Sequence, residues 1–381
     1  MMRTATVGWG RVVVAVLLAV GSWMPLVGLA APAAAPPAQE KPTDTPSLTS
    51  IPLGKGLPVV VRTGLFFNHI EAFDDNKATF EATTDLRLSW HDPRLRYPVE
   101  QGLNGYKEYR VSAAEEQIAK IWTPPVRYVN RVGEPTFTER RLRIYPDGRV
   151  ETIARTTAVY KTPVDVTRFP FDHQSLQIEL IVREDTVESV DLDYTSEDVE
   201  YSKVAKRVEL GGWTPGLIHL KRELIAGWNG DRYAKVQVSL DVQRDAMGAI
   251  ATIFIPLFAS LLIPFLATWM NRADGDSFEV EGFELANVII GGLFAVIALG
   301  FTINSAFPLL AQSDNTVSRL LGLNYTALAM GLIITVAFYR YRLPARWFGP
   351  YVQEQMFRFL AWAFPVVFIA VGLGFVAIAA A

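Results

Sequence analysis

Residues 233–270, YAKVQVSLDVQRDAMGAIATIFIPLFASLLIPFLATWM, decide the fold of this 381-residue chain. Up to Arg244 the stretch alternates apolar and polar residues, a pattern that is typical of a β-strand with one buried face. From Met247 onward it is apolar almost throughout, and a helix of about 20 apolar residues is long enough to cross a bilayer. The sequence therefore changes at Arg244 from a β domain to a membrane-spanning segment.

On the C-terminal side of this stretch, three more apolar runs follow at short intervals. The sequence predicts a transmembrane domain over residues 245–381, with spans at about 247–270, 285–307, 320–338 and 359–380. The connection between the third and fourth spans has a single acidic residue, Glu354, and is rich in arginine: Arg340, Arg342, Arg346 and Arg358. Because short cytoplasmic loops carry such an excess, we expect this loop to be cytoplasmic and the β domain to lie outside.

The connection between the first and second spans does not fit that rule, although it is expected on the same side of the membrane. It contains one basic residue, Arg272, and five acidic residues: Asp274, Asp276, Glu279, Glu281 and Glu284. Its acidity therefore needs an explanation other than topology.

On the N-terminal side, residues 59–244 predict an antiparallel β-sandwich. Alternating runs occur at 82–90, 141–145, 150–160, 175–182 and 234–242. Turn signals such as Pro146-Asp147-Gly148 separate them. About ten short strands without long helical patterns indicate two packed sheets. One short amphipathic helix is expected near residues 112–119.

The first residues are typical of a secretory signal peptide. Arg3 and Arg11 precede an apolar run over residues 12–30, and small residues follow this run up to Ala35. We expect residues 1–35 to be removed and 36–58, rich in Pro, Ala, Thr and Ser, to form a disordered lead-in. An uncleaved anchor helix is the alternative interpretation, because the run is of spanning length.

Composition excludes several function classes. The net charge is −3, so there is no basic surplus for a nucleic-acid partner. The chain has no cysteine, and its four histidines are scattered, so we expect neither a metal nor another cofactor. No nucleophile, metal or phosphate-loop motif predicts an enzyme. The acidic run 184–200 is interpreted as a solvated loop, with a weak Ca²⁺-binding or proton-sensitive patch as the alternative.

Residues 167–174, TRFPFDHQ, resemble the signature loop of the pentameric ligand-gated ion channels, the Cys-loop receptor superfamily. In animal members two cysteines bracket this loop, whereas here Thr162 and Leu176 stand at those positions, as in the bacterial branch. Residues 176–183, LQIELIVR, are similar to the bacterial proton-gated channels. Further resemblances, over about 59–381, are Trp90 with Asp92, Trp122-Thr123-Pro124, Arg244, Pro256, Ala286-Asn287-Val288 and Pro308.

The resemblance implies an extracellular immunoglobulin-like β-sandwich followed by a four-helix transmembrane bundle, assembled as a homopentamer around a central pore. It implies a ligand-gated ion channel in the bacterial inner membrane, with a periplasmic or extracellular N-terminal domain. The expected partners are other copies of the chain, a small extracellular ligand or protons, permeant ions and membrane lipid. A non-conducting, membrane-tethered periplasmic binding or interaction protein is the alternative function.

The second span then explains the acidic loop, because a carboxylate ring at the inner mouth of a pore attracts cations. Alignment on Pro308 places Glu284 at that mouth and predicts cation selectivity. Steps of three and four residues define one helical face: Glu284, Asn287, Gly291, Phe294, Ala298, Phe301 and Ser305. Polar residues at both ends suit ions, and phenylalanine rings between them suit a gate that closes by dewetting. The alternative is that this face contacts neighbouring helices.

By resemblance, the contact zone between the β domain and the spans couples ligand binding to the pore. It comprises Asp74, Asp75, Phe169, Pro170, Phe171, Asp172, Arg244 and Pro308. The charges of Asp75, Asp172 and Arg244 predict an interfacial cluster. Whether this cluster rearranges during gating or is a static salt bridge stays open at this point.

The ligand site of the family is an aromatic box that binds an ammonium group by cation–π attraction. Here Arg183 stands at the position of the central tryptophan and Asp85 at that of an early-strand aromatic residue. The candidate ligand-binding residues are Tyr128, Arg183, Trp228 and Tyr233, with Tyr128 facing the hairpin that carries the last two. Arg183 disfavours an amine and favours a carboxylate or other anion. Protons are a second candidate agonist, although the second span contains no histidine.

Overall fold

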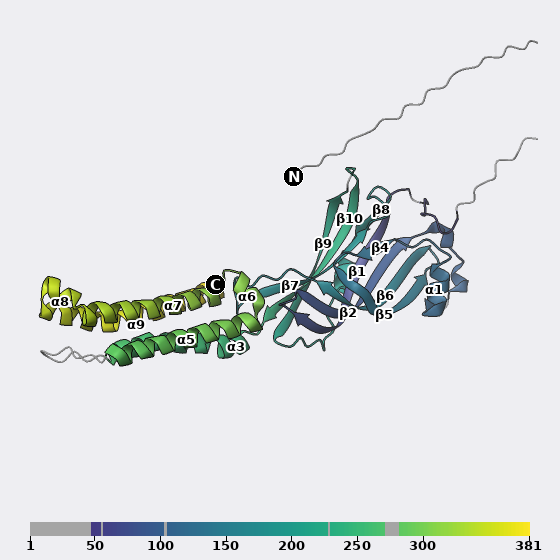
Figure 1. Ribbon diagram of the computed structural model, residues 1–381. Helices are drawn as coiled ribbons and strands as arrows, with labels where there is room; N and C mark the ends of the chain where they lie inside the picture. The colour runs from purple at the N-terminus through teal and green to yellow at the C-terminus, as the bar shows by residue number, and fades with distance from the viewer. Residues whose placement is uncertain (1–46, 55, 103–104, 228, 271–281) are drawn as a thin grey trace, which may run out of the picture. The chain divides into compact units, whose positions relative to one another are not determined.

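The computed structural model describes residues 47–381 except 55, 103–104, 228 and 271–281 (Figure 1). The predicted signal peptide and residues 36–46 of the predicted lead-in lie outside the described residues. Residues 47–50, which belong to the same lead-in, are tied to the sandwich. The backbone N–H of Trp122 donates to the Leu48 carbonyl at 2.7 Å, and Arg94 donates to the carbonyls of Ser47 and Ser50, each at 2.8 Å.

The strands form two sheets in the described part of the chain. The six-stranded sheet has the order β3 (Lys107–Arg110), β5 (Arg131–Ile144), β6 (Arg149–Lys161), β2 (Thr79–His91), β1 (Val59–Asp74) and β8 (Val190–Asp193). The four-stranded sheet has the order β4 (Val126–Tyr128), β7 (His173–Val182), β10 (Arg232–Arg244) and β9 (Trp213–Ala226). All pairs are antiparallel except β1 with β8.

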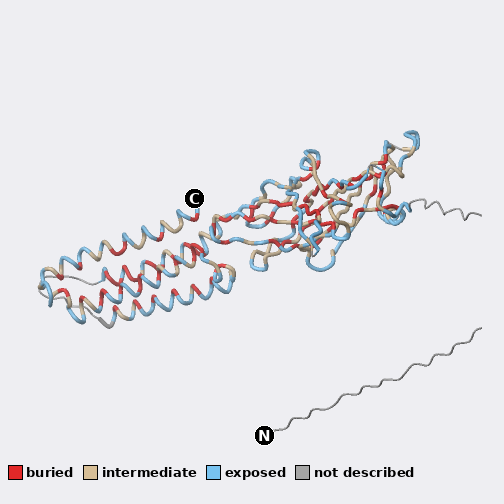
Figure 2. The backbone as a smooth tube through the Cα atoms, turned by 90° about the horizontal axis from the view of Figure 1, so that it is seen from above, coloured by how far each residue is buried: buried red, intermediate tan, exposed pale blue. Residues whose placement is uncertain are grey.

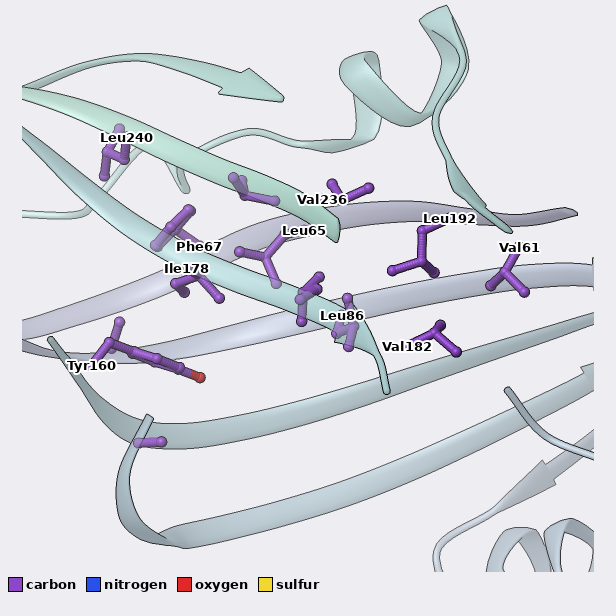
Figure 3. Close-up of a cluster of buried hydrophobic side chains, with 14 of the residues drawn as sticks. Val61, Leu65, Phe67, Leu86, Tyr160, Ile178, Val182, Leu192, Val236 and Leu240 are labelled. Carbon is purple, nitrogen blue, oxygen red and sulfur yellow. The ribbon is translucent and has the colours of Figure 1, made fainter. Parts of the chain in front are cut away.

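The core lies between these two sheets, because every second residue of a strand points inward. On β2, Phe80, Ala82, Thr84 and Leu86 are buried, and the residues between them are only partly buried. Figure 3 shows side chains from both sheets meeting there, including Phe67 of β1, Tyr160 of β6 and Ile178 of β7. Full burial of one such large apolar side chain contributes roughly 1.5–3 kcal/mol. The predicted two-sheet sandwich is confirmed.

Short helices lie between the strands: η1 (Pro93–Leu95), η2 (Val99–Gln101), α1 (Ser112–Ile118) and α2 (Ser196–Tyr201). The expected amphipathic helix near 112–119 is α1. The interpretation of residues 184–200 as a solvated loop is wrong, since they contain β8 and α2. Asp191 accepts hydrogen bonds from Arg222 of β9, and Asp198 accepts one from Arg87 of β2 at 2.7 Å. These partners are distant in sequence, so the acidic run gave no sign of them.

Helices make up the described chain after Arg244, and Figure 1 shows the long ones lying lengthwise beside one another. They are α3 (Ala246–Ala249), the π-helical turn η4 (Ile250–Phe254), α4 (Ile255–Trp269), α5 (Gly282–Ala306), α6 (Pro308–Gln312), α7 (Thr316–Thr335), the π-helical turn η5 (Val336–Arg340), α8 (Leu343–Phe348) and α9 (Pro350–Ala380). By length and composition, four candidate membrane spans occur among the described residues: Ala246–Trp269, Glu284–Ala306, Thr316–Arg340 and Pro350–Ala380.

The helices carry exposed as well as buried positions along their length (Figure 2). Inside the bundle, the hydroxyl of Ser260 on α4 donates to the Asn324 side-chain oxygen on α7 at 2.7 Å. The Asn324 amide donates in turn to the carbonyl of Leu257 at 3.2 Å. Such buried polar pairs hold membrane helices together, because lipid offers these groups no partner. The predicted order of a β-sandwich followed by a four-helix bundle is confirmed.

Candidate functional site

Arg244 ends β10 and joins three elements of the domain boundary. Its Nε donates to Asp172 at 2.7 Å and its Nη2 donates to Asp75 at 2.8 Å. The Arg244 side chain is 10% exposed and that of Asp172 is 1% exposed. Burial alone lowers the pKa of Arg244, but the hydrogen bonds with Asp172 and Asp75 outweigh it and raise the pKa. The structure thus brings together the three charges that the sequence predicted to cluster.

Trp213 and Gln174, which were not predicted as site residues, complete this cluster. The guanidinium of Arg244 lies 4.1 Å from the ring centre of Trp213 and 5.0 Å from that of Phe169. The amide of Gln174 donates to Asp172 at 2.6 Å, so both carboxylate oxygens of Asp172 have donors. A buried carboxylate and guanidinium are stable only with such partners. We name Asp75, Asp172, Gln174, Trp213 and Arg244 the arginine cluster.

Phe169 connects the arginine cluster to the helices. It is 1% exposed, and its ring packs 6.3 Å from those of Phe254 in η4 and Phe307 before α6. The same apolar cluster includes Ile303 of α5 and Leu320 of α7. One loop residue of the β domain therefore contacts the first candidate span and the residue that follows the second, and it shares an apolar cluster with the third.

The rest of the predicted contact zone is arranged around these groups. The amide of Asn76, next to Asp75, donates to the Ala306 carbonyl at the end of α5 at 3.3 Å. Asp74 pairs instead with Lys77 at 2.9 Å, and hydrogen bonds from Lys77 lower the pKa of its carboxyl. Pro170 is buried and Phe171 half-buried, while Pro308 is exposed as the first residue of α6.

The predicted pore face of α5 is exposed along its whole length in the single chain. The exposed members are Glu284, Asn287, Gly291, Phe294, Ala298, Phe301 and Ser305. The opposite face is buried against neighbouring helices by Leu285, Ile289, Gly292, Val296, Gly300 and Ile303. A side chain at Gly292 would collide with Ile263 of α4 and Leu328 of α7, each under 3.0 Å, so this glycine permits close helix packing. Phe294 and Phe301 remain 67% and 75% exposed.

Two of the ligand candidates lie at the same end of the four-stranded sheet. Arg183 is exposed and directly follows β7, and Tyr233 is the second residue of β10. β7 pairs with β10 through Ile181 and Lys235, so continuing this register by two residues sets Arg183 opposite Tyr233. Trp228, in the hairpin before Tyr233, lies outside the described residues.

Tyr128, the third described candidate, lies between the two sheets. Its ring contacts that of Tyr160 at 5.7 Å, and burial raises the pKa of its hydroxyl. It lines a cavity of about 540 Å³ bordered by Arg131 of β5 and Thr156 of β6. The aromatic identity of this residue could be read from the sequence, but the direction of its side chain could not.

The outward face of the six-stranded sheet carries a second set of paired charges. Asp85 of β2 accepts two hydrogen bonds from Arg155 of β6, both at 2.8 Å. Burial raises the pKa of Asp85, and the hydrogen bond from Arg155 outweighs this effect, so the pKa is lowered overall. Beside them, Arg87 lies 4.2 Å from the ring centre of Tyr201 and pairs with Asp198. Arg155 and Arg87 were not predicted as site residues.

No group of three or more His, Asp or Glu side chains with metal-binding geometry occurs among the described residues. The arrangement offers no catalytic constellation there either. It instead links the β-sandwich to the helices through one buried ion-pair cluster and one buried phenylalanine.

Comparison with known proteins agrees with this geometry. Residues 49–246 match the sequence pattern of the neurotransmitter-gated ion-channel ligand binding domain. The chain is 30% identical to the proton-gated ion channel of Gloeobacter violaceus over 66% of its own length and 65% of that channel. It is 26% identical to the theta subunit of the mouse (Mus musculus) gamma-aminobutyric acid receptor, over 57% of its own length and 33% of that subunit.

The alignments therefore span less than two thirds of either relative, while the ligand-binding pattern covers more than half of the chain. The described membrane helices follow directly on that pattern. The chain belongs to the family of pentameric, neurotransmitter-gated ion channels, whose members are channels and not enzymes.

Proposed function

We propose that this chain forms a homopentameric, cation-selective channel in the inner membrane of a bacterium. The observation that carries the proposal is the exposed face of α5, which lies opposite the stripe that α4 and α7 bury. A single chain leaves this face open. A closed ring of five copies would turn it toward a common axis and enclose a path for ions.

The chemistry of this face supports cation conduction. Glu284 at one end gives the ring negative charge. Asn287 and Ser305 offer oxygen atoms that can replace part of the water shell of an ion. Phe294 and Phe301 narrow the path with apolar rings, where a closed pore loses its water.

Gating then runs through the arginine cluster and Phe169. A ligand that shifts β7 or β10 moves Asp172 or Arg244, because these residues flank the two strands. Phe169 carries this movement to Phe254 and Phe307, at the ends of the first and second spans. The coupling element is bistable in our proposal, with two packings of one apolar cluster as the closed and open states.

The agonist is a small extracellular ligand with a carboxylate or other anionic group, or the proton. Arg183 beside Tyr233 supports the first. The similarity to a relative described as a proton-gated ion channel supports the second. In this proposal residues 1–35 are a cleaved signal peptide, residues 59–244 lie in the periplasm, and the arginine-rich connection before α9 is cytoplasmic.

Recording from the purified full-length protein in planar bilayers tests this function. Currents should arise when the pH falls or when small carboxylates are added on the side of the β domain, with reversal potentials that follow the cation gradient. Native mass measurement of the same sample should give five copies. A monomer or dimer that passes no current under any of these conditions would instead fit a non-conducting binding protein.

A further inference from the structure

The loop between β6 and β7, residues 162–172, is shaped by side chains. It carries Phe169 and Asp172, which contact the helices and Arg244. Its residues belong to no strand or helix, so the hydrogen bonds of a sheet do not fix their positions. The chain contains no cysteine, so no disulfide closes the loop either. We name residues 162–172 the boundary loop.

Gln174, the second residue of β7, ties the two arms of the boundary loop together. It is 3% exposed. Its side-chain oxygen accepts a hydrogen bond from the backbone N–H of Asp165 at 3.0 Å, and its amide nitrogen donates to the carbonyl of the same residue at 2.6 Å. That nitrogen also donates to the Asp172 carboxylate at 2.6 Å. A carboxamide has two N–H groups and one oxygen, and all three are used here.

Thr162 closes the neck of the boundary loop. It is 3% exposed, and its hydroxyl donates to the carbonyl of Ser175 at 2.7 Å. The same oxygen accepts a hydrogen bond from the backbone N–H of Gln177 at 3.2 Å. Thr162 and Gln174 therefore attach the loop to the first residues of β7 at two levels.

The apolar residues of the boundary loop follow directly on the peptide that Gln174 binds. Val166 and Phe169 are 7% and 1% exposed and belong to the same apolar cluster as Phe254 of η4. The backbone N–H of Phe169 donates to the Val166 carbonyl at 3.1 Å, so a tight turn connects them. A shift of Asp165 relative to β7 would carry this turn, and the phenyl ring with it, away from the helices.

We propose that Gln174 is a positioning residue for gating and that Thr162 supports it. The carboxamide holds the boundary loop in the shape in which Phe169 and Asp172 reach the helices and Arg244 at the same time. Without it, more backbone conformations are available to the loop, and ordering them costs conformational entropy. The stimulus needed to open the channel then rises, while the ion path along α5 is unchanged. This last step rests on the proposed channel function, whereas the positioning of the loop does not.

The competing explanation is a local role, in which Gln174 only satisfies the buried carboxylate of Asp172. Two of its three hydrogen bonds go instead to the peptide of Asp165, on the other arm of the loop. A side chain that served Asp172 alone would not need them.

Hydrogen–deuterium exchange of the full-length protein in detergent, followed by mass spectrometry, tests the positioning directly. In the wild type the Asp165 amide should exchange slowly, although it lies in no strand or helix. Gln174→Met keeps the length of the side chain and removes its hydrogen bonds, so the boundary loop should exchange roughly fivefold faster. Gln177→Met, on the outward face of the same strand, is the matched control and should leave the loop at the wild-type rate.

Two results of this measurement would overturn the proposal. One is a boundary loop that exchanges equally fast in Gln174→Met and in the wild type. The other is an Asp165 amide that exchanges in the wild type at the rate of an unprotected peptide. The second result needs no variant, so it decides the matter even if the substituted chain folds poorly.

A double-mutant cycle of melting temperatures shows whether Gln174 acts through Phe169. Because Phe169→Ala already removes the contact with the helices, adding Gln174→Met to it should lower the melting temperature less than Gln174→Met does alone. Gln174→Met with Phe137→Ala, which removes an exposed ring of β5, should be additive. Full additivity of Gln174→Met with Phe169→Ala would assign Gln174 to stability alone and refute the positioning role.

Recording in planar bilayers, with acid steps or with acetate as the stimulus, tests the consequence for gating. Gln174→Met and Thr162→Val should each raise the concentration of protons or acetate for half-maximal current roughly fivefold and leave the single-channel conductance unchanged. A changed conductance, or an unchanged half-maximal concentration in Gln174→Met, would contradict the role in gating. A wild type that passes no current would refute the proposed channel function instead, and the exchange and melting measurements would still decide whether Gln174 positions the loop.

Discussion

Asp172 holds Arg244 with both oxygens of its carboxylate, at 2.7 and 3.1 Å, although the two residues lie 72 positions apart in the chain. The backbone repeats the contact, because the N–H of Arg244 donates to the Asp172 carbonyl at 3.2 Å. The carboxylate follows a loop that packs on the membrane helices, and the guanidinium ends the strand that leads into them. Any movement of one relative to the other must break a buried, charge-assisted contact.

Asp172→Asn tests how much this contact contributes to stability and to gating. The substitution leaves Arg244 buried with one acidic partner, Asp75, and breaking a buried ion pair costs about 3–5 kcal/mol. We expect a clear fall in the melting temperature in detergent and the loss of gated current. Glu116→Gln is the control, since it removes an exposed carboxylate of α1. If both variants melt together with the wild type, the arginine cluster does not stabilise the domain boundary.

Phe169→Ala probes the apolar half of the same boundary. Removal of a fully buried phenyl ring costs about 3–5 kcal/mol through lost burial and the cavity left behind. Because the ring contacts Phe254 and Phe307, we expect higher agonist concentrations for half-maximal current at unchanged conductance. Phe137→Ala removes an exposed ring of β5 and serves as the control. An unshifted dose–response curve for Phe169→Ala would exclude this side chain from gating.

Sequence reasoning located these residues well because short-range patterns and family resemblance both pointed to them. Alternation identified β2, β6, β7 and β10, since a half-buried strand must repeat every two residues. Asp172 and Arg244 were predicted together from the signature loop and the strand end. Their pairing depends on the register between β7, which directly follows Asp172, and β10, which ends at Arg244.

Other features depend on long-range packing and could not be predicted. Trp213 is one aromatic residue at the start of β9, and nothing in its neighbourhood indicates that it covers Arg244. Arg222 and Arg87 neutralise the acidic run 184–200 from distant strands. Helix α9 begins at Pro350, whereas the predicted span begins at about residue 359. Hydropathy does not identify the earlier part of this helix as membrane-spanning, because that part contains Gln353, Glu354 and Arg358.

We expect the difference in stability between Asp85→Asn and the wild type to depend on pH. Because the pKa of Asp85 is lowered by Arg155, its contribution is present above the unfolded pKa, about 3.9, and is lost as the pH falls through the lower folded value. Arg155 is 42% exposed, which limits the contribution to about 1 kcal/mol. We expect the variant to melt below the wild type at pH 7, and the difference between their melting temperatures to narrow as the pH falls below about 3.9.

The same lowered pKa predicts that Asp85 stays ionised between pH 5 and 7 and is not a proton sensor. A proton-activated current, if present, should therefore keep its pH of half-maximal activation in Asp85→Asn. Glu116→Gln, an exposed substitution in α1, controls for the loss of one negative charge. A shift confined to Asp85→Asn would assign it a role in proton sensing against this prediction.

Glu284→Gln tests the proposed selectivity. Neutral side chains at the inner mouth remove the ring of negative charge, so the reversal potential in asymmetric salt should move toward zero. Glu284→Lys should move it further and lower the conductance for cations. Glu354→Gln, which removes a carboxylate paired with Arg358 on α9, should leave the reversal potential unchanged. Unchanged potentials in both Glu284 variants would assign the role to a residue of the preceding acidic segment, such as Glu281.

Phe294→Ser tests the proposed gate. A ring of five phenyl groups excludes water more than it stabilises an ion, whereas serine hydroxyls hold water in the constriction. We therefore expect current without agonist, or opening at a lower stimulus, with normal expression. Phe301→Ser alters the next phenylalanine of the same exposed face and shows which ring dominates. A leak in Phe301→Ser alone places the gate nearer the outer mouth. Channels that stay closed in both variants would mean that α5 turns a different face to the ion path.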